Sequence, residues 1–151
     1  MVVNRQRRVA VAVKPLEDFA GQARRALRFR EDGVTVCLIS DAAIARLNRR
    51  YRGKKGPTDV LSFPANGDGG GSRRAVSRTR TRDSRGAYVG DIAISPAAAR
   101  RNARRYSRSL PDELRVLILH GMLHLAGYDH ESDHGEMERM ERRMRRQLGL
   151  R

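Results

Sequence analysis

The feature that most constrains the fold is a run of apolar residues that extends from Leu114 to Ala126. Pro111, a residue favoured in the first turn of a helix, precedes the run, and Gly127, a residue favoured just after a helix end, follows it. The run is therefore predicted to form one helix. Because apolar side chains occupy nearly every side of this helix, it is expected to be buried, with other elements packed around it.

Alternating strand and helix patterns supply these surrounding elements. Runs of β-branched and apolar residues predict four strands, at Val9–Val13, Val34–Ile39, Val60–Phe63 and Ala87–Ile94. Helical spacing predicts helices over about 16–30, from Ser95-Pro96 to about Tyr106, over 135–148, and a short one with Asp41 as its N-cap. The expected fold is a single α/β (α+β) domain over residues 1–151, in which a mixed sheet of about four strands packs with several helices.

Residues 65–86 differ in character from the rest of the chain. The segment contains Gly67-Asp-Gly-Gly-Gly-Ser72, and six arginines fall between Arg73 and Arg85. It has no apolar periodicity that would place it on a core. We therefore expect a flexible Arg/Gly-rich loop within the domain.

All four histidines lie between positions 120 and 134. His120 and His124 are four residues apart on the buried helix, so their side chains project from the same face, one turn apart. Gly127 ends the helix, and the chain can then turn back so that His130 approaches the same point. Three imidazoles without a thiolate suit one zinc ion and leave a fourth position for water, as in catalytic zinc sites. His134 lies among acidic residues and is expected to be a solvated surface residue.

The helix also argues against one class of zinc enzyme. Metalloproteases of the His-Glu-x-x-His type carry their general base directly after the first histidine. Gly121 occupies that position here. Peptide hydrolysis by that route is therefore disfavoured.

The charge of the chain points to a polyanionic partner. Lys and Arg total 32 against 17 Asp and Glu, which gives a formal net charge of +15. A surface this basic attracts nucleic acid. The single cysteine, Cys37, allows no intrachain disulfide, and no apolar stretch is long enough for a secretory or membrane segment. We therefore expect a cytoplasmic protein.

Three blocks of the sequence resemble the YbeY family of bacterial endoribonucleases and rRNA maturation factors. The first, His120-Gly-Met-Leu-His-Leu-Ala-Gly-Tyr-Asp-His130, matches every fixed position of the family signature. Tyr51-Arg-Gly53 with Pro57-Thr-Asp-Val-Leu-Ser-Phe-Pro64 is similar to the central loop and strand of the family. Gly90-Asp-Ile-Ala-Ile-Ser95 resembles its next strand. The resemblance spans roughly residues 34–148.

The resemblance implies a fold, an activity and a set of site residues. It implies a small α/β domain with a zincin-like metal helix and a single-strand-specific, zinc-dependent endoribonuclease. Such an enzyme acts in 16S rRNA 3′-end maturation and in late-stage ribosome quality control. The implied zinc ligands are His120, His124 and His130, and the implied functional arginine is Arg52, whose guanidinium could stabilise phosphate charge. The implied partners are single-stranded and ribosomal RNA, ribosomal subunits, a small-subunit ribosomal protein and a ribosome-associated GTPase.

Two other functions are compatible with the residues. The first is a non-catalytic rRNA-binding ribosome assembly factor with a structural metal. The second is another zinc hydrolase that acts on peptides or small molecules, which Gly121 and the basic surface argue against.

Overall fold

The computed structural model describes residues 1–65, 88–129 and 133–150. Its strands are β1 (Val2–Asn4), β2 (Val34–Leu38), β3 (Val60–Pro64) and β4 (Gly90–Ile94). Its helices are α1 (Val13–Ala26), α2 (Asp41–Arg52), α3 (Pro96–Arg105), α4 (Leu110–Leu125) and α5 (Glu136–Gln147). The predicted α/β fold with a four-stranded mixed sheet is confirmed. The loop predicted at 65–86 lies outside the described residues apart from Ala65.

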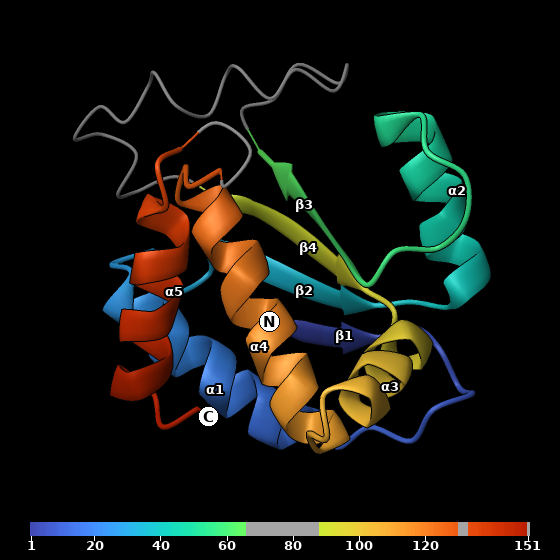
Figure 1. Ribbon diagram of the computed structural model, residues 1–151, viewed down its shortest axis with the longest axis horizontal. Helices are drawn as coiled ribbons and strands as arrows, with labels where there is room; N and C mark the ends of the chain where they lie inside the picture. Colours follow the sequence, from blue (N-terminus) through green and yellow to red (C-terminus); the bar gives the residue numbers. More distant parts are fainter. Residues whose placement is uncertain (66–87, 130–132, 151) are drawn as a thin grey trace.

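The four strands form one sheet in the order β1-β2-β4-β3 (Figure 1). β1, β2 and β4 run parallel, with Val2 opposite Val36 and Val36 opposite Ile92. β3 is antiparallel to β4, with Val60 opposite Ile94. The parallel pairs require crossovers, which α1 and the segment containing α2 and β3 supply.

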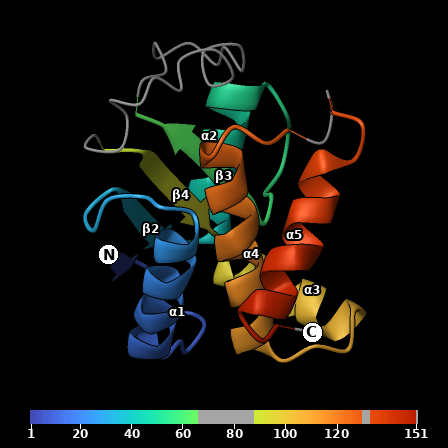
Figure 2. The same ribbon diagram turned by 90° about the vertical axis from the view of Figure 1, so that its left-hand side faces the viewer.

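The main hydrophobic core lies between one face of the sheet and α1, α4 and α5. Helix α4 is at its centre, with α1 on one side and α5 on the other (Figure 2). It is buried on most sides, as the apolar run predicts. A smaller cluster on the opposite face packs Ile44 of α2 against Leu61 and Ala93. No helix in the described part of the chain has the length and apolar character needed to cross a membrane.

The predicted first strand, Val9–Val13, is wrong. The edge of the sheet is formed by β1, and the hydrogen bond from Arg5 N to Leu38 O extends its pairing with β2. Val9 is buried but lies in a non-strand segment, where the Gln6 side chain bonds to both its backbone N–H and its carbonyl oxygen. Helix α1 begins at Val13, so Pro15 lies in its first turn. Proline is tolerated there because the N–H groups of a first turn have no helical partner.

The predicted N-cap of α2 is also wrong by one residue. Ser40 is the cap, and its hydroxyl accepts a hydrogen bond from Ala43 N at 3.1 Å. Asp41 instead bonds to Ser95 Oγ at 2.6 Å and to Arg101 Nη1 at 2.8 Å, so it ties α2 to the start of α3. The hydrogen bond from Arg101 has the largest effect on the pKa of Asp41. Together with the hydrogen bond from Ser95, it holds that pKa below its ordinary value. The predicted Ser95 cap of α3 is confirmed.

Helix α4 lies close to the sheet at Gly121. A Cβ atom at this position would lie 2.8 Å from Ile92 Cγ2 and 3.0 Å from Ile92 Cδ1 in β4. The Ser62 hydroxyl of β3 also donates a hydrogen bond to the Gly121 carbonyl oxygen at 3.1 Å. Only glycine therefore lets the helix backbone sit this close to the sheet.

We expect Gly121→Ala to lower the free energy of unfolding by about 1–2 kcal/mol. The added methyl group displaces a fully buried isoleucine, and this overpacking outweighs the gain in helix propensity. Gly21→Ala in α1 is the matched control, because a Cβ there meets only the Arg25 side chain at 3.5 Å. That control should raise stability by about 0.5–1 kcal/mol. Urea unfolding measures both, and equal effects would contradict the close approach.

Candidate metal site and adjoining cleft

The side chains of His120 and His124 converge on one point beside α4. Their Nε2 atoms are 3.1 Å apart, and their rings are nearly perpendicular, with centroids 4.7 Å apart. At this separation one N–H donates a hydrogen bond to the other nitrogen, or both lone pairs bind the same cation. The four-residue spacing thus produces the predicted convergence of these two histidines.

The separation of the two nitrogens fits a bound zinc ion. Two nitrogens at tetrahedral positions around Zn²⁺ lie about 3.3 Å apart, because each Zn–N bond is about 2.05 Å long. The observed 3.1 Å is close to that value. The pair also consists of borderline-soft nitrogen donors, which zinc accepts.

The chain leaves α4 as the predicted metal site requires. Gly127 has a φ of +96°, its N–H bonds to His124 O, and the N–H of Tyr128 bonds to Leu123 O. These two hydrogen bonds form a Schellman motif, which ends the helix and reverses the chain. The third predicted ligand, His130, lies outside the described residues. His134 is exposed, as expected for a surface residue.

Glu141 of α5 faces the other nitrogen of His120. Its Oε2 lies 3.7 Å from His120 Nδ1, and its side chain is 17% exposed. Arg145 holds the carboxylate from the other side, with Nη2 3.3 Å from Oε1. Burial alone would raise the pKa of Glu141, but His120 and Arg145 outweigh it and lower the pKa below its ordinary value. An ionised carboxylate beside Nδ1 favours the tautomer that leaves the Nε2 lone pair available for a metal.

Glu141 was not identified from the sequence, although a signal for it exists. The apolar face of α5 consists of Met137, Met140 and Met144, and position 141 lies on that same face. An acidic residue there is either buried at a cost or paired. The observed ion pairs show that it is paired.

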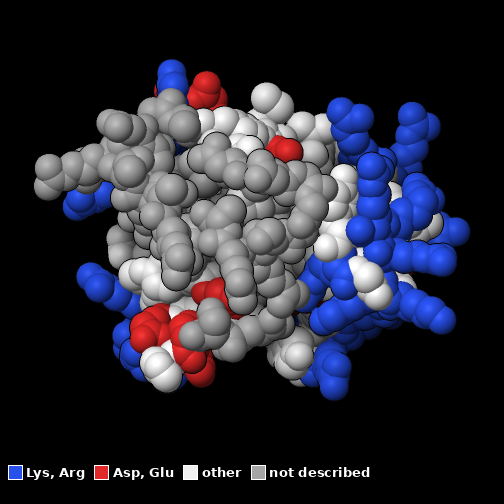
Figure 3. Space-filling model, turned by 90° about the horizontal axis from the view of Figure 1, so that it is seen from above, with Lys and Arg blue, Asp and Glu red and all other residues white. Residues whose placement is uncertain are grey.

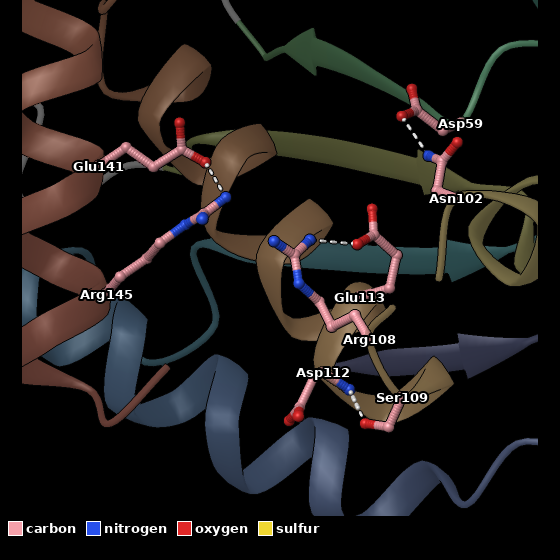
Figure 4. A network of polar contacts seen from close by, with 8 residues as sticks. All are labelled: Asp59, Asn102, Arg108, Ser109, Asp112, Glu113, Glu141 and Arg145. Carbon is pink, nitrogen blue, oxygen red and sulfur yellow. Dashed lines mark hydrogen bonds and ion pairs between the residues drawn. The ribbon is translucent and has the colours of Figure 1, made fainter. Parts of the chain in front are cut away.

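A cleft of about 410 Å³ begins at His120 and follows α4 toward its N-terminus. Figure 4 shows Glu141 and Arg145 of α5 on one side and Asp59 and Asn102 on the other. Buried side chains of α4, among them Leu117, form the floor. His120 is therefore reached through a groove large enough for a small organic group.

Arg52 is the last residue of α2, although the resemblance assigns Tyr51-Arg-Gly53 to the central loop of the family. Gly53 follows it with a φ of +65°, and the Tyr51 ring packs edge-on against Phe63 with centroids 5.3 Å apart. These contacts anchor the helix end and leave Arg52 exposed. Arg52 does not line the cleft beside His120.

Arg52 belongs to a surface that we call the α2 basic cluster. Its members are six exposed cations: Arg46, Arg49, Arg50, Arg52, Lys54 and Lys55. No acidic residue occurs between positions 42 and 58. Figure 3 shows Lys and Arg side chains crowded on the side of the molecule that carries α2. This surface attracts polyanions.

Comparison with known proteins gives a consistent result. Residues 2–149 match the family model described as Endoribonuclease YbeY. The chain is 41% identical over 150 residues to the Endoribonuclease YbeY of Koribacter versatilis. This alignment covers 99% of this chain and 86% of that protein. It is 39% identical over 155 residues to the Moorella thermoacetica protein of the same name, with coverage of 95% and 85%. The solution structure of a Thermotoga maritima protein superposes with a TM-score of 0.59 at 26% identity and covers 98% of this chain and 89% of that one.

We expect Glu141→Gln to weaken zinc binding by roughly 10- to 100-fold, because the carboxylate no longer orients His120. Competition with a chromogenic chelator measures the affinity without any activity assay. Glu138→Gln is the matched control, since Glu138 lies on the exposed face of the same helix and pairs with Arg142. His124→Ala should lose the metal, and His134→Ala should retain it. Equal zinc affinity in the Glu141 and Glu138 variants would show that Glu141 does not orient the ligand.

Proposed function

The chain belongs to the YbeY family of endoribonucleases, and on this premise we propose that it is a metal-dependent endoribonuclease that hydrolyses phosphodiester bonds of single-stranded RNA. The observation that carries the proposal is the pair of histidine nitrogens, 3.1 Å apart, one of which belongs to His120 at the end of an open cleft. Histidine nitrogens in this geometry are suited to hold an ion that acts on a phosphate group.

His120 and His124, together with His130, would hold one zinc ion per chain. When bound, the ion supplies Lewis-acid chemistry that polarises a phosphoryl oxygen or lowers the pKa of a water molecule. Glu141 orients the ring of His120, and the close contact between α4 and β4 keeps both histidines at a fixed position relative to the sheet. Gly121 faces the sheet, so no side chain at that position could act as the general base of a peptidase.

The α2 basic cluster supports RNA as the substrate. Its six cations attract the sugar–phosphate backbone without reading sequence, as non-specific nucleic-acid surfaces do. Within it, Arg52 is held at a helix end by the packing of Tyr51 and by the Gly53 turn. The planar guanidinium can donate two parallel hydrogen bonds to phosphate oxygens. We therefore assign Arg52 to phosphate binding during cleavage.

The remaining parts of the proposal follow from the family resemblance. The substrate in the cell is 16S rRNA, cleaved during 3′-end maturation and in late-stage ribosome quality control. The partners are ribosomal subunits, a small-subunit ribosomal protein and a ribosome-associated GTPase, and the location is the cytoplasm. Residues 1–151 act as one metallohydrolase domain.

Metal-loaded protein is expected to cut single-stranded RNA at internal positions and to leave a duplex of the same sequence intact. A chelator should abolish cleavage, and added zinc should restore it, because the histidines need the ion to act on phosphate. Gel analysis of end-labelled RNA gives the result. Folded, metal-containing protein that leaves single-stranded RNA uncut would contradict the proposal and favour a non-catalytic assembly factor with a structural metal.

Arg52→Ala should retain zinc and fold normally but lose roughly 10²–10³-fold in kcat/KM for single-stranded RNA, as expected when one donor to a developing phosphate charge is removed. Arg46→Ala is the matched control, because it removes one exposed charge from the same cluster. That control should change only the salt-dependent affinity. Similar small effects of the two substitutions would place Arg52 among the general backbone contacts.

A further inference from the structure

We infer that the cleft beside His120 is a subsite for one unpaired nucleobase of the RNA, stacked on Tyr106. The inference rests on the proposed function and extends it by naming what the cleft binds. The cleft, of about 410 Å³, is within the range of small-ligand sites. His120 is at one end, so a base in the cleft belongs to a nucleotide next to the phosphate at the metal site.

In the part of the cleft that extends away from the histidines, the charges favour a neutral occupant over a phosphate. Its two cations are already paired, Arg108 with the buried Glu113 and Arg145 with Glu141. Asp59 adds a third carboxylate, so these side chains together carry one net negative charge, apart from any ion held by the histidines. A phosphate would be repelled, whereas a neutral base would not. The backbone phosphates therefore lie outside the cleft, where the α2 basic cluster can attract them.

The polar groups opposite α5 suit the edge of a base. Asn102 Nδ2 donates a hydrogen bond to Asp59 Oδ2 at 3.0 Å, and Asp59 Oδ1 accepts one from Val60 N at 2.8 Å. These contacts fix an amide and a carboxylate at the start of β3. Together they present donor and acceptor groups, which are the groups that a Watson–Crick edge recognises once the base is unpaired.

Tyr106 provides a flat surface at the rim of the same cleft. It follows α3 directly, is 58% exposed, and is one of only three large exposed hydrophobic residues in the described part of the chain. Of these three, only Tyr106 lines the cleft. Asn102 lies one helical turn before it and therefore on the same side. The Arg105 and Arg108 guanidinium carbons lie 5.9 and 5.8 Å from its ring centroid. Single-stranded nucleic acids commonly stack their bases on such exposed aromatic rings.

The test combines substitutions with RNA oligonucleotides in which one base at a time is missing. In the wild type, removing the base next to the cleavage site should weaken binding by roughly tenfold, because one stacking contact is lost. Tyr106→Ala should bind the intact oligonucleotide about tenfold more weakly and should no longer distinguish it from the abasic one. Tyr106→Phe should behave like the wild type, because the ring remains. Fluorescence anisotropy measures binding, and in cleavage assays Tyr106→Ala should raise KM with little change in kcat.

Tyr88→Ala is the matched control, since Tyr88 is 41% exposed but does not line the cleft. The inference is overturned if Tyr106→Ala keeps the wild-type affinity and abasic profile, or if the wild type binds no single-stranded oligonucleotide. A wild type that binds with the Tyr106-dependent profile but never cuts RNA would retain the subsite and refute the proposed activity. The two failures are therefore distinguishable.

Discussion

The structure depends on the close contact between α4 and β4. Gly121 brings the helix backbone against Ile92, and that contact determines which way the neighbouring positions point. Because Gly121 faces the sheet, His120 and His124 project from another side of the helix, and His120 lines the cleft. The four-residue spacing puts His120 and His124 on a common face, where their Nε2 atoms are 3.1 Å apart, and the packing of Gly121 sets the direction of that face relative to the sheet. The same contact explains why glycine, rather than the glutamate of peptidases, follows the first histidine.

Charge is distributed differently over the two surfaces that the RNA would touch. In the cleft, arginines are paired with carboxylates, and the net charge is slightly negative. On the α2 basic cluster, six cations occur in a stretch without acidic residues. The cleft therefore favours a neutral base and the α2 basic cluster favours phosphates, although arginine is prominent in both surfaces. The formal net charge of +15 predicts attraction to a polyanion. It does not predict the charge difference between the cleft and the α2 basic cluster, because that difference depends on which charged residues the fold brings together.

Local patterns predicted the elements that have strong local signals. The apolar run, the Ser95-Pro96 start and the Gly127 end are confirmed, because caps and periodicity are properties of neighbouring residues. β1 was missed because its three residues are defined by pairing with a distant strand, whereas Val9–Val13 has the better strand composition. Ser40 and Asp41 are both good caps, and a tertiary contact with Arg101 decided between them. Glu141 and the cleft depend on how α5 packs against α4, which spacing alone does not define. His130 and the zinc itself stay predictions.

The wall of the cleft that carries Glu141 and Arg145 rests on an unusually deformable support. Helix α5 packs on the core through the buried Met137 and Met144 and the partly buried Met140. Methionine side chains are unbranched and polarisable, and they fill gaps of different shape with little penalty. Small shifts of α5 can therefore be taken up largely by these three methionine side chains. For the base subsite inferred above, a wall of this kind would let the cleft adapt to bases of unequal size. Tolerance of base size then becomes a property of side-chain plasticity at a helix interface.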